Sequence, residues 1–172
     1  MYSYACEVNM STVNIFRIQL VAGYVVWLLC LQAWFWAKFK AMDRFDAQRA
    51  IATLHSFRFF GLVFIVPGVV GPNLPASFAV FAAYWDFLTG VLAILALLTV
   101  RVRPLFQTFF VAFNVVGAAD ILVDYYHAIR SGVPAIAGQF GATYFIPIIY
   151  VPLLMITHMV AFYWLFRPQG NR

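Results

Sequence analysis

Residues 77–100 read SFAVFAAYWDFLTGVLAILALLTV, and Asp86 is the single charged side chain within them. About 20 apolar residues in a helix match the hydrocarbon thickness of a bilayer, where a span must satisfy its backbone hydrogen bonds internally. Polar and apolar residues do not alternate strictly in this stretch, which favours a helix over a strand of a membrane barrel. Residues 77–100 therefore predict a transmembrane helix that carries one intramembrane carboxylate.

Comparable apolar runs lie on both sides of this stretch. We predict further spans at residues 18–39, 50–70, 105–127 and 142–166. The connections are short, and the segment PGVVGPNLP at residues 67–75 breaks helix geometry because proline lacks the amide N–H. The sequence thus predicts an all-α polytopic membrane helix bundle of about five transmembrane helices, in a single integral membrane domain over residues 1–172.

The composition of the chain also indicates a membrane protein. It has 172 residues, of which 65% are hydrophobic and 10% charged, whereas typical soluble domains carry about 25% charged residues. The net charge of +5 does not indicate nucleic-acid binding, because the basic residues lie between the apolar runs and form no long basic arm. We therefore expect the protein to contact the lipid bilayer and not to bind nucleic acid. The sequence does not decide whether it also associates with other membrane subunits.

Basic residues are distributed unevenly over the predicted connections. One side of the membrane would carry most of them, namely Lys38, Lys40, Arg44, Arg49, Arg101, Arg103, Arg167 and Arg172. The other side would carry Arg17 and Arg130. Since cytoplasmic loops are enriched in lysine and arginine, this asymmetry predicts an N-terminus outside and a C-terminus in the cytoplasm. No cleavable signal peptide is visible, and either Met1 or Met10 fits as the start.

Ionisable side chains inside the predicted spans are the candidates for function. A charge at the bilayer centre costs about 2.5–3.5 kcal/mol, so such groups face the bundle interior and pair with one another. The predicted inner set is His55, Arg58, Asp86, Asn114 and His158. We predict that Arg58 pairs with Asp86 or with an anionic ligand, and that the set lines a pocket for a small polar or quinone-like ligand. In the structural alternative, Arg58 extends to the cytoplasmic surface along its apolar stem.

A second polar face lies on the predicted helix at residues 105–127. Asp120, Asp124 and His127 follow one another at helical steps of four and three, so they share one face near the outer surface. This outer face is a second candidate site, or it is simply hydrated at the membrane surface. Carboxylates and an imidazole can hold a metal ion, but one helix rarely completes such a site, and no metal site is predicted.

The residues also permit two other functions. His55 and His158 lie at similar predicted depth on different helices, as axial ligands of a b-type haem would. Asp86 together with Asp120 and Asp124 could instead serve a proton-coupled small-molecule carrier. The sequence shows no hydrolase triad order, phosphate loop or paired cysteines, so we predict no catalytic residues and no independent catalytic activity.

Residues 58–107 carry a family resemblance. Arg58 leads into FFGLVFIVPGVV, then LPASFAVF follows, and Asp86 opens DFLTGVLAILALLTVRVRP. These features resemble the DoxX-like small membrane proteins, which tend to show an arginine before a glycine-containing helix and an acidic residue before a Gly/Leu-rich one. The resemblance implies a four-helix bundle preceded by one added span, in a bacterial inner membrane, sometimes linked to quinone or sulfur redox chemistry. Asp86 stands where glutamate is more usual, and no reaction is inferred.

Overall fold

The computed structural model describes residues 10–166, and every regular element in that range is helical. The elements are α1 (Thr12–Cys30), η1 (Leu31–Phe35), α2 (Trp36–Ala41), α3 (Arg44–His55), η2 (Ser56–Ile65), α4 (Ala76–Leu98), α5 (Arg103–Arg130), η3 (Val133–Tyr144), η4 (Ile146–Tyr150) and α6 (Val151–Phe166). The start at Met1 and the tail charges of Arg167 and Arg172 lie outside the described residues.

Four segments are long and apolar enough to cross a membrane. They are Thr12–Ala41, Ala76–Leu98, Arg103–Arg130 and Ile146–Phe166. These segments match the predicted spans at residues 18–39, 77–100, 105–127 and 142–166. Large apolar side chains on their outer faces are exposed, for example Val26, Leu98 and Leu122. Such a surface is consistent with lipid contact.

The predicted span at residues 50–70 is not one regular α-helix. Asp43 caps α3 by accepting a hydrogen bond from Phe45 N at 2.9 Å, so this helix begins earlier than predicted. It ends at His55, and the chain continues as the 3₁₀ helix η2 (Ser56–Ile65). A 3₁₀ helix has 3.0 residues per turn, so side chains three apart lie directly above one another.

The period of three residues per turn places one row of η2 side chains on the buried face of this helix. Its buried residues are Arg58, Gly61 and Phe64, which therefore lie on one face. That face packs against α4. A Cβ atom at Gly61 would overlap the Asp86 carboxylate, so only glycine allows the close approach. The irregular helix thus places Arg58 beside α4.

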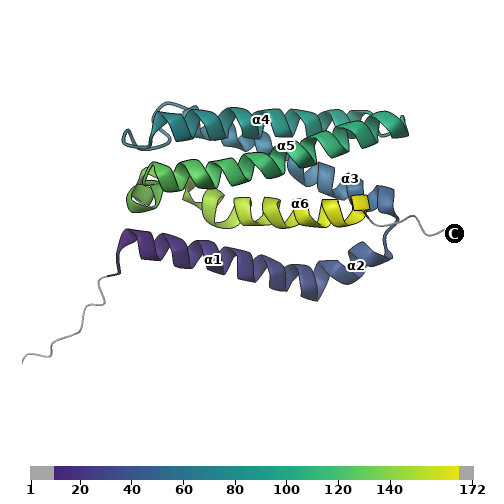
Figure 1. The fold of residues 1–172 in the computed structure, drawn as a ribbon, viewed down its shortest axis with the longest axis horizontal. Helices are drawn as coiled ribbons and strands as arrows, with labels where there is room; N and C mark the ends of the chain where they lie inside the picture. The colour runs from purple at the N-terminus through teal and green to yellow at the C-terminus, as the bar shows by residue number, and fades with distance from the viewer. Residues whose placement is uncertain (1–9, 167–172) are drawn as a thin grey trace, which may run out of the picture.

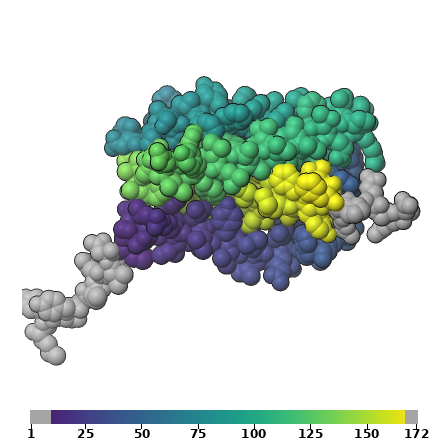
Figure 2. Space-filling model, viewed as in Figure 1, coloured from purple at the N-terminus to yellow at the C-terminus, as the bar shows by residue number. Residues whose placement is uncertain are grey.

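The helices form a bundle with one peripheral helix. Figure 1 shows α4 and α5 as a pair, α6 beside α5, and α1 with α2 as an outer layer. In Figure 2 the surface of α6 lies between α1–α2 and α5. Phe16 is the single buried residue of Thr12–Cys30, whereas α4, α5 and α6 each bury many. Helix α1 therefore lies on the outside of the bundle, along a seam with η3, η4 and α6.

The seam between α1 and the bundle uses the irregular start of the last helix. Proline lacks an N–H, so Pro152 leaves Ile148 O without its usual helical partner, and the segment Ile146–Tyr150 forms a π turn. A Cβ atom at Gly23 would overlap this Ile148 oxygen, so glycine lets α1 approach. Trp27 Nε1 donates to the neighbouring Ile149 O at 2.9 Å.

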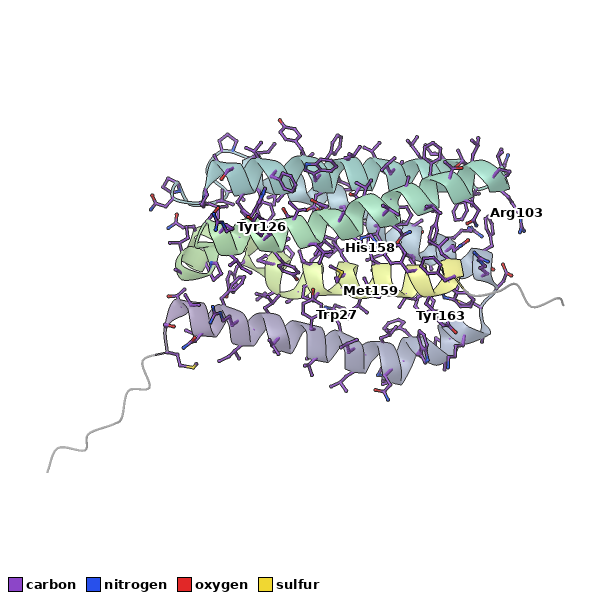
Figure 3. The ribbon with its side chains drawn as sticks, viewed as in Figure 1. Trp27, Arg103, Tyr126, His158, Met159 and Tyr163 are labelled. Atoms are coloured by element: carbon purple, nitrogen blue, oxygen red, sulfur yellow. The ribbon has the colours of Figure 1, made fainter. Side chains whose placement is uncertain are left out.

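Two apolar clusters lie at opposite ends of the bundle and leave a polar layer between them. One cluster contains Phe106, Phe110 and Ala93, and the other contains Phe78 and Phe140. The polar layer between them holds most of the ionisable residues that the sequence places in the membrane. Figure 3 shows His158, a member of this layer, midway along the bundle and away from both ends.

Candidate functional site

Arg58 is the centre of the polar layer, and its side chain is only 1% exposed. Nε donates to Asp86 Oδ1 at 2.7 Å, Nη2 lies 2.5 Å from Asp120 Oδ2, and Nη1 donates to Gly117 O at 3.2 Å. Pairing with Asp86 is as predicted. Extension of Arg58 to the cytoplasmic surface is wrong, because two buried carboxylates hold the guanidinium inside the bundle.

Gly117 of α5 makes room for the guanidinium. A Cβ atom there would come within 2.5 Å of Arg58 Nη1 and 2.8 Å of His158 Nε2. Such contacts are closer than packed side chains tolerate, so any larger residue would displace the arginine or the imidazole. The absence of a side chain at Gly117 therefore admits the Arg58 guanidinium.

His158 has a partner on each ring nitrogen. Nδ1 lies 3.0 Å from Asn114 Oδ1, and Nε2 lies 3.3 Å from Arg58 Nη1. Asn114 donates its amide group to Phe110 O at 2.7 Å, which leaves its oxygen free to accept from His158. Since guanidinium only donates, the neutral tautomer with its proton on Nδ1 satisfies both contacts.

His55 lies against His158 but has a different partner. Its Nε2 lies 3.0 Å from Thr157 Oγ1, which itself donates to Leu153 O at 2.9 Å. The threonine hydroxyl therefore accepts from His55, and the proton of this imidazole is on Nε2. His55, Arg58, Asn114 and His158 are all buried, so they fill the space that the sequence predicted them to line.

The two histidines do not fit a haem. Their ring centroids are 4.1 Å apart. A metal–imidazole bond is about 2 Å long, so two nitrogens on opposite sides of one iron are about 4 Å apart, and their ring centroids lie farther apart still. Direct ring contact leaves no room for a porphyrin between them. The alternative in which His55 and His158 are the axial ligands of one haem does not fit this arrangement of the rings.

The predicted outer face of Asp120, Asp124 and His127 is separated into three environments. Asp120 reaches inward to Arg58 and is completely buried. Asp124 lies one turn away and faces a cavity. His127 packs its ring on Phe81 at 4.7 Å between centroids. No three His, Cys, Asp or Glu side chains among residues 10–166 are arranged to hold a metal ion.

The cavity lies between α1 and the bundle and has a volume of about 690 Å³. Its walls are mainly apolar and come from α1, η2, α4, α5, η3, η4 and α6. The polar residues that line it are Arg17, Tyr24, Asp86, Asp124 and Tyr125. Of the five residues predicted to line an inner pocket, Asp86 is the one that reaches this cavity, so the open space lies beside the predicted site.

The tyrosines at the cavity were missed as site residues by the sequence analysis. Tyr24 Oη and Tyr125 Oη lie 2.7 Å apart and join α1 to α5 across the cavity wall. Tyr125 and Tyr126 both follow Asp124 in the sequence, yet Tyr126 is exposed and Tyr125 lines the cavity, so the sequence alone does not distinguish them.

No curated protein and no solved structure matches the chain significantly. A protein family described as a domain of unknown function (DUF8737) matches residues 15–166, and the similarity to DoxX-like proteins stays a prediction. Because this match covers nearly all of the 172 residues, the chain belongs to the DUF8737 family.

Proposed function

We propose that this chain is an integral membrane protein that binds a small amphipathic ligand between α1 and the helix bundle. The observation that carries the proposal is the cavity of about 690 Å³, with apolar walls and two carboxylates, Asp86 and Asp124. Ligand pockets are typically about 300–1,000 Å³, largely apolar, with a few placed polar groups. Arg58 holds Asp86 in place, so one polar group of the cavity is fixed before any ligand enters.

The proposal includes five crossings of the membrane. Besides the four long apolar segments, α3 and η2 together would form one crossing, which is the second in chain order; they have 12 and 10 residues. At about 1.5 Å per residue for an α-helix and 2.0 Å for a 3₁₀ helix, the pair extends about 38 Å, which exceeds the hydrocarbon thickness of about 30 Å. An odd number of crossings agrees with α1 beginning at one end of the bundle and α6 ending at the other (Figure 1).

The proposed orientation places the N-terminus outside. Figure 3 shows Arg103 at the end of the bundle where α2, α3 and the close of α6 also lie. The loops and helix ends there contain Lys38, Lys40, Arg44, Arg49, Arg101 and Arg103. The opposite end contains Arg17 and Arg130, so the positive-inside rule makes the Arg103 end cytoplasmic. The cavity, which Arg17 lines, then lies in the outer half of a membrane that we propose to be the bacterial inner membrane.

A proton-coupled carrier is the second candidate function. The observation that favours it is a pair of buried oxygens, Asp120 Oδ1 and Asp124 Oδ1, which have no hydrogen-bond partner among residues 10–166. A buried carboxylate oxygen without a partner is a suitable place for a proton. This candidate predicts that Asp124→Asn abolishes substrate-coupled proton movement in vesicles. Unchanged proton movement in that variant would remove the candidate.

The binding proposal is tested by filling the cavity. Ala128 lines the cavity on α5, whereas Ala119 is exposed on the same helix. We expect Ala128→Trp to remove a small molecule that native mass spectrometry detects on the protein purified in a mild neutral detergent. Ala119→Trp is the matched control and should retain it. If the two variants carry the same bound molecules as the unaltered protein, the cavity is not the binding site.

A further inference from the structure

We propose that the ligand of this cavity carries a positively charged nitrogen, which Asp124 receives, while its apolar part occupies the rest of the cavity. This inference rests on the proposed function, because it names the chemical class of the ligand for the same site. The ligand class is thus an amphipathic amine or ammonium compound.

The charges around the cavity do not balance. Arg58 is one cation, and it contacts two carboxylates, Asp86 and Asp120. Asp124 adds a third carboxylate one helical turn from Asp120. Arg17 also lines the cavity but forms no ion pair with residues 10–166, so even with Arg17 counted there are three carboxyl groups for two cations. An ionised Asp124 would therefore lack a counter-charge in this low-dielectric site, and a cationic ligand head would supply it.

The unused hydrogen-bonding capacity points to the same chemistry. Asp86 directs one oxygen, Oδ1, to two nitrogens of Arg58. Asp124 Oδ1 is buried and has no hydrogen-bond partner in the part of the chain that the structure describes. Asp86 and Asp124 both line the cavity and both are acceptors when ionised. A ligand head that donates hydrogen bonds complements these two carboxylates, whereas a carboxylate head, or a quinone head that only accepts, would pair with Arg17 and leave Asp86 and Asp124 as they are.

The remaining wall of the cavity is rich in aromatic rings. The rings that line it belong to Phe16, Tyr24, Phe64, Phe78, Tyr125 and Phe140. Aromatic faces attract cations through their quadrupole, and combinations of aromatic rings with a carboxylate are used to bind ammonium groups. The same rings pack well against an apolar chain. The site therefore offers both parts of an amphipathic amine a matching surface.

The test compares four decyl probes on the full chain in neutral maltoside micelles by calorimetric titration. The probes share one tail and carry an ammonium, a hydroxyl, a carboxylate or a benzoquinone head. We expect decylammonium to bind about tenfold or more tightly than decanol, because hydrogen bonds to charged groups are the stronger ones. Decanoate and the quinone should bind no more tightly than decanol.

Protein variants distinguish the contribution of the probe's head group to binding from that of its decyl tail. We expect Asp124→Asn to reduce decylammonium affinity about tenfold and to change decanol affinity by less than about twofold. Asp46→Asn is the matched control, because Asp46 is an exposed partner of Arg49, and it should change neither affinity. Retained decanol binding shows that the Asp124→Asn protein is folded. The comparison of ammonium with decanol on the unaltered chain needs no variant at all.

The outcomes distinguish the two proposals. If decanol binds as tightly as decylammonium, or if Asp124→Asn leaves the decylammonium affinity unchanged, the inferred charge of the ligand is wrong. The proposed cavity still stands in that case, provided that Ala128→Trp blocks binding of both probes. If no probe binds in a manner that Ala128→Trp prevents, the cavity proposal and the inferred charge are both wrong. Competition by phosphatidylethanolamine would support a lipid as the source of the amine, and its absence would support a free amphiphile.

Discussion

The polar layer around Arg58 and the cavity beside α1 are neighbours that use their polar residues in opposite ways. Around Arg58, the guanidinium nitrogens contact carboxylates, a carbonyl and an imidazole, and no space is left. At the cavity, Asp124 and the Tyr24–Tyr125 pair border about 690 Å³ of open volume. Asp86 belongs to both regions. Buried charge in this protein therefore organises the bundle, and the adjoining free volume is where we propose that a ligand binds.

Removal of Arg58 should have the largest effect, because this side chain is the centre of the polar layer. Arg58→Met leaves Asp86 and Asp120 as buried carboxylates without a counter-charge. Loss of one partner of a buried ion pair costs about 3–5 kcal/mol, so we expect a large fall in melting temperature or no folded protein. Arg49→Met is the control, since its ion pair with Asp46 is exposed and contributes about 0–1 kcal/mol. Equal thermal stability of the two variants would show that the Arg58 cluster does not hold the bundle together.

A methyl group at Gly61 should have the next largest effect. The added Cβ atom would overlap the Asp86 carboxylate, so η2 would have to move away from α4. Overpacking of this kind costs about 1–3 kcal/mol, and chemical denaturation of Gly61→Ala should show it. Gly138→Ala is the matched control, because no atom lies within 4 Å of the position where its Cβ would be. A Gly61→Ala protein as stable as the control would mean that η2 does not pack this closely.

Loosening α1 should affect the cavity more than the bundle. Tyr24→Phe removes the hydrogen bond to Tyr125, and Trp27→Phe removes the one to Ile149 O. Each bond contributes about 0.5–1.5 kcal/mol, so we expect the double variant to bind probes more weakly at nearly unchanged stability of the Arg58 layer. Probe affinity and hydrogen exchange of α5 amides measure the two quantities. Faster exchange throughout α5 would indicate that α1 supports the whole bundle.

The smallest effect should come from His127. Its ring packs on Phe81 and lies outside both the Arg58 layer and the cavity lining. His127→Phe preserves a ring at this position, so we expect a change in unfolding free energy within about 0.5 kcal/mol and no change in probe affinity. A large loss of probe affinity would show that the outer polar face acts as one site after all.

The sequence was most informative where one physical requirement dominated. Apolar length predicted the helices around Asp86, Asn114 and His158, and the cost of intramembrane charge predicted that Arg58 pairs with Asp86. Hydropathy does not distinguish a 3₁₀ helix from an α-helix, so the sequence analysis did not predict that η2 is a 3₁₀ helix. The spacing of Arg58, Gly61 and Phe64 by three residues was an available signal for it.

Other features depend on distances that the sequence does not contain. Depth estimates placed Asp120 with Asp124 and His127, but the long side chain of Arg58 reaches Asp120 across the bundle. The two histidines were predicted at similar depth, yet only the structure shows that their rings touch. The cavity arises because α1 joins the bundle along one seam, through Gly23 and Trp27. Such a packing arrangement follows from tertiary contacts rather than from a local pattern.

We propose that a ligand occupies the cavity between α1 and the bundle. Electron cryomicroscopy of the unaltered chain and of Ala128→Trp, both in lipid nanodiscs, would show whether the cavity is filled. We predict non-protein density in contact with Asp124 in the unaltered chain and none there in the variant. Density absent from both, with α1 packed directly onto α5 so that Tyr24 and Val21 fill the space, would contradict the claim.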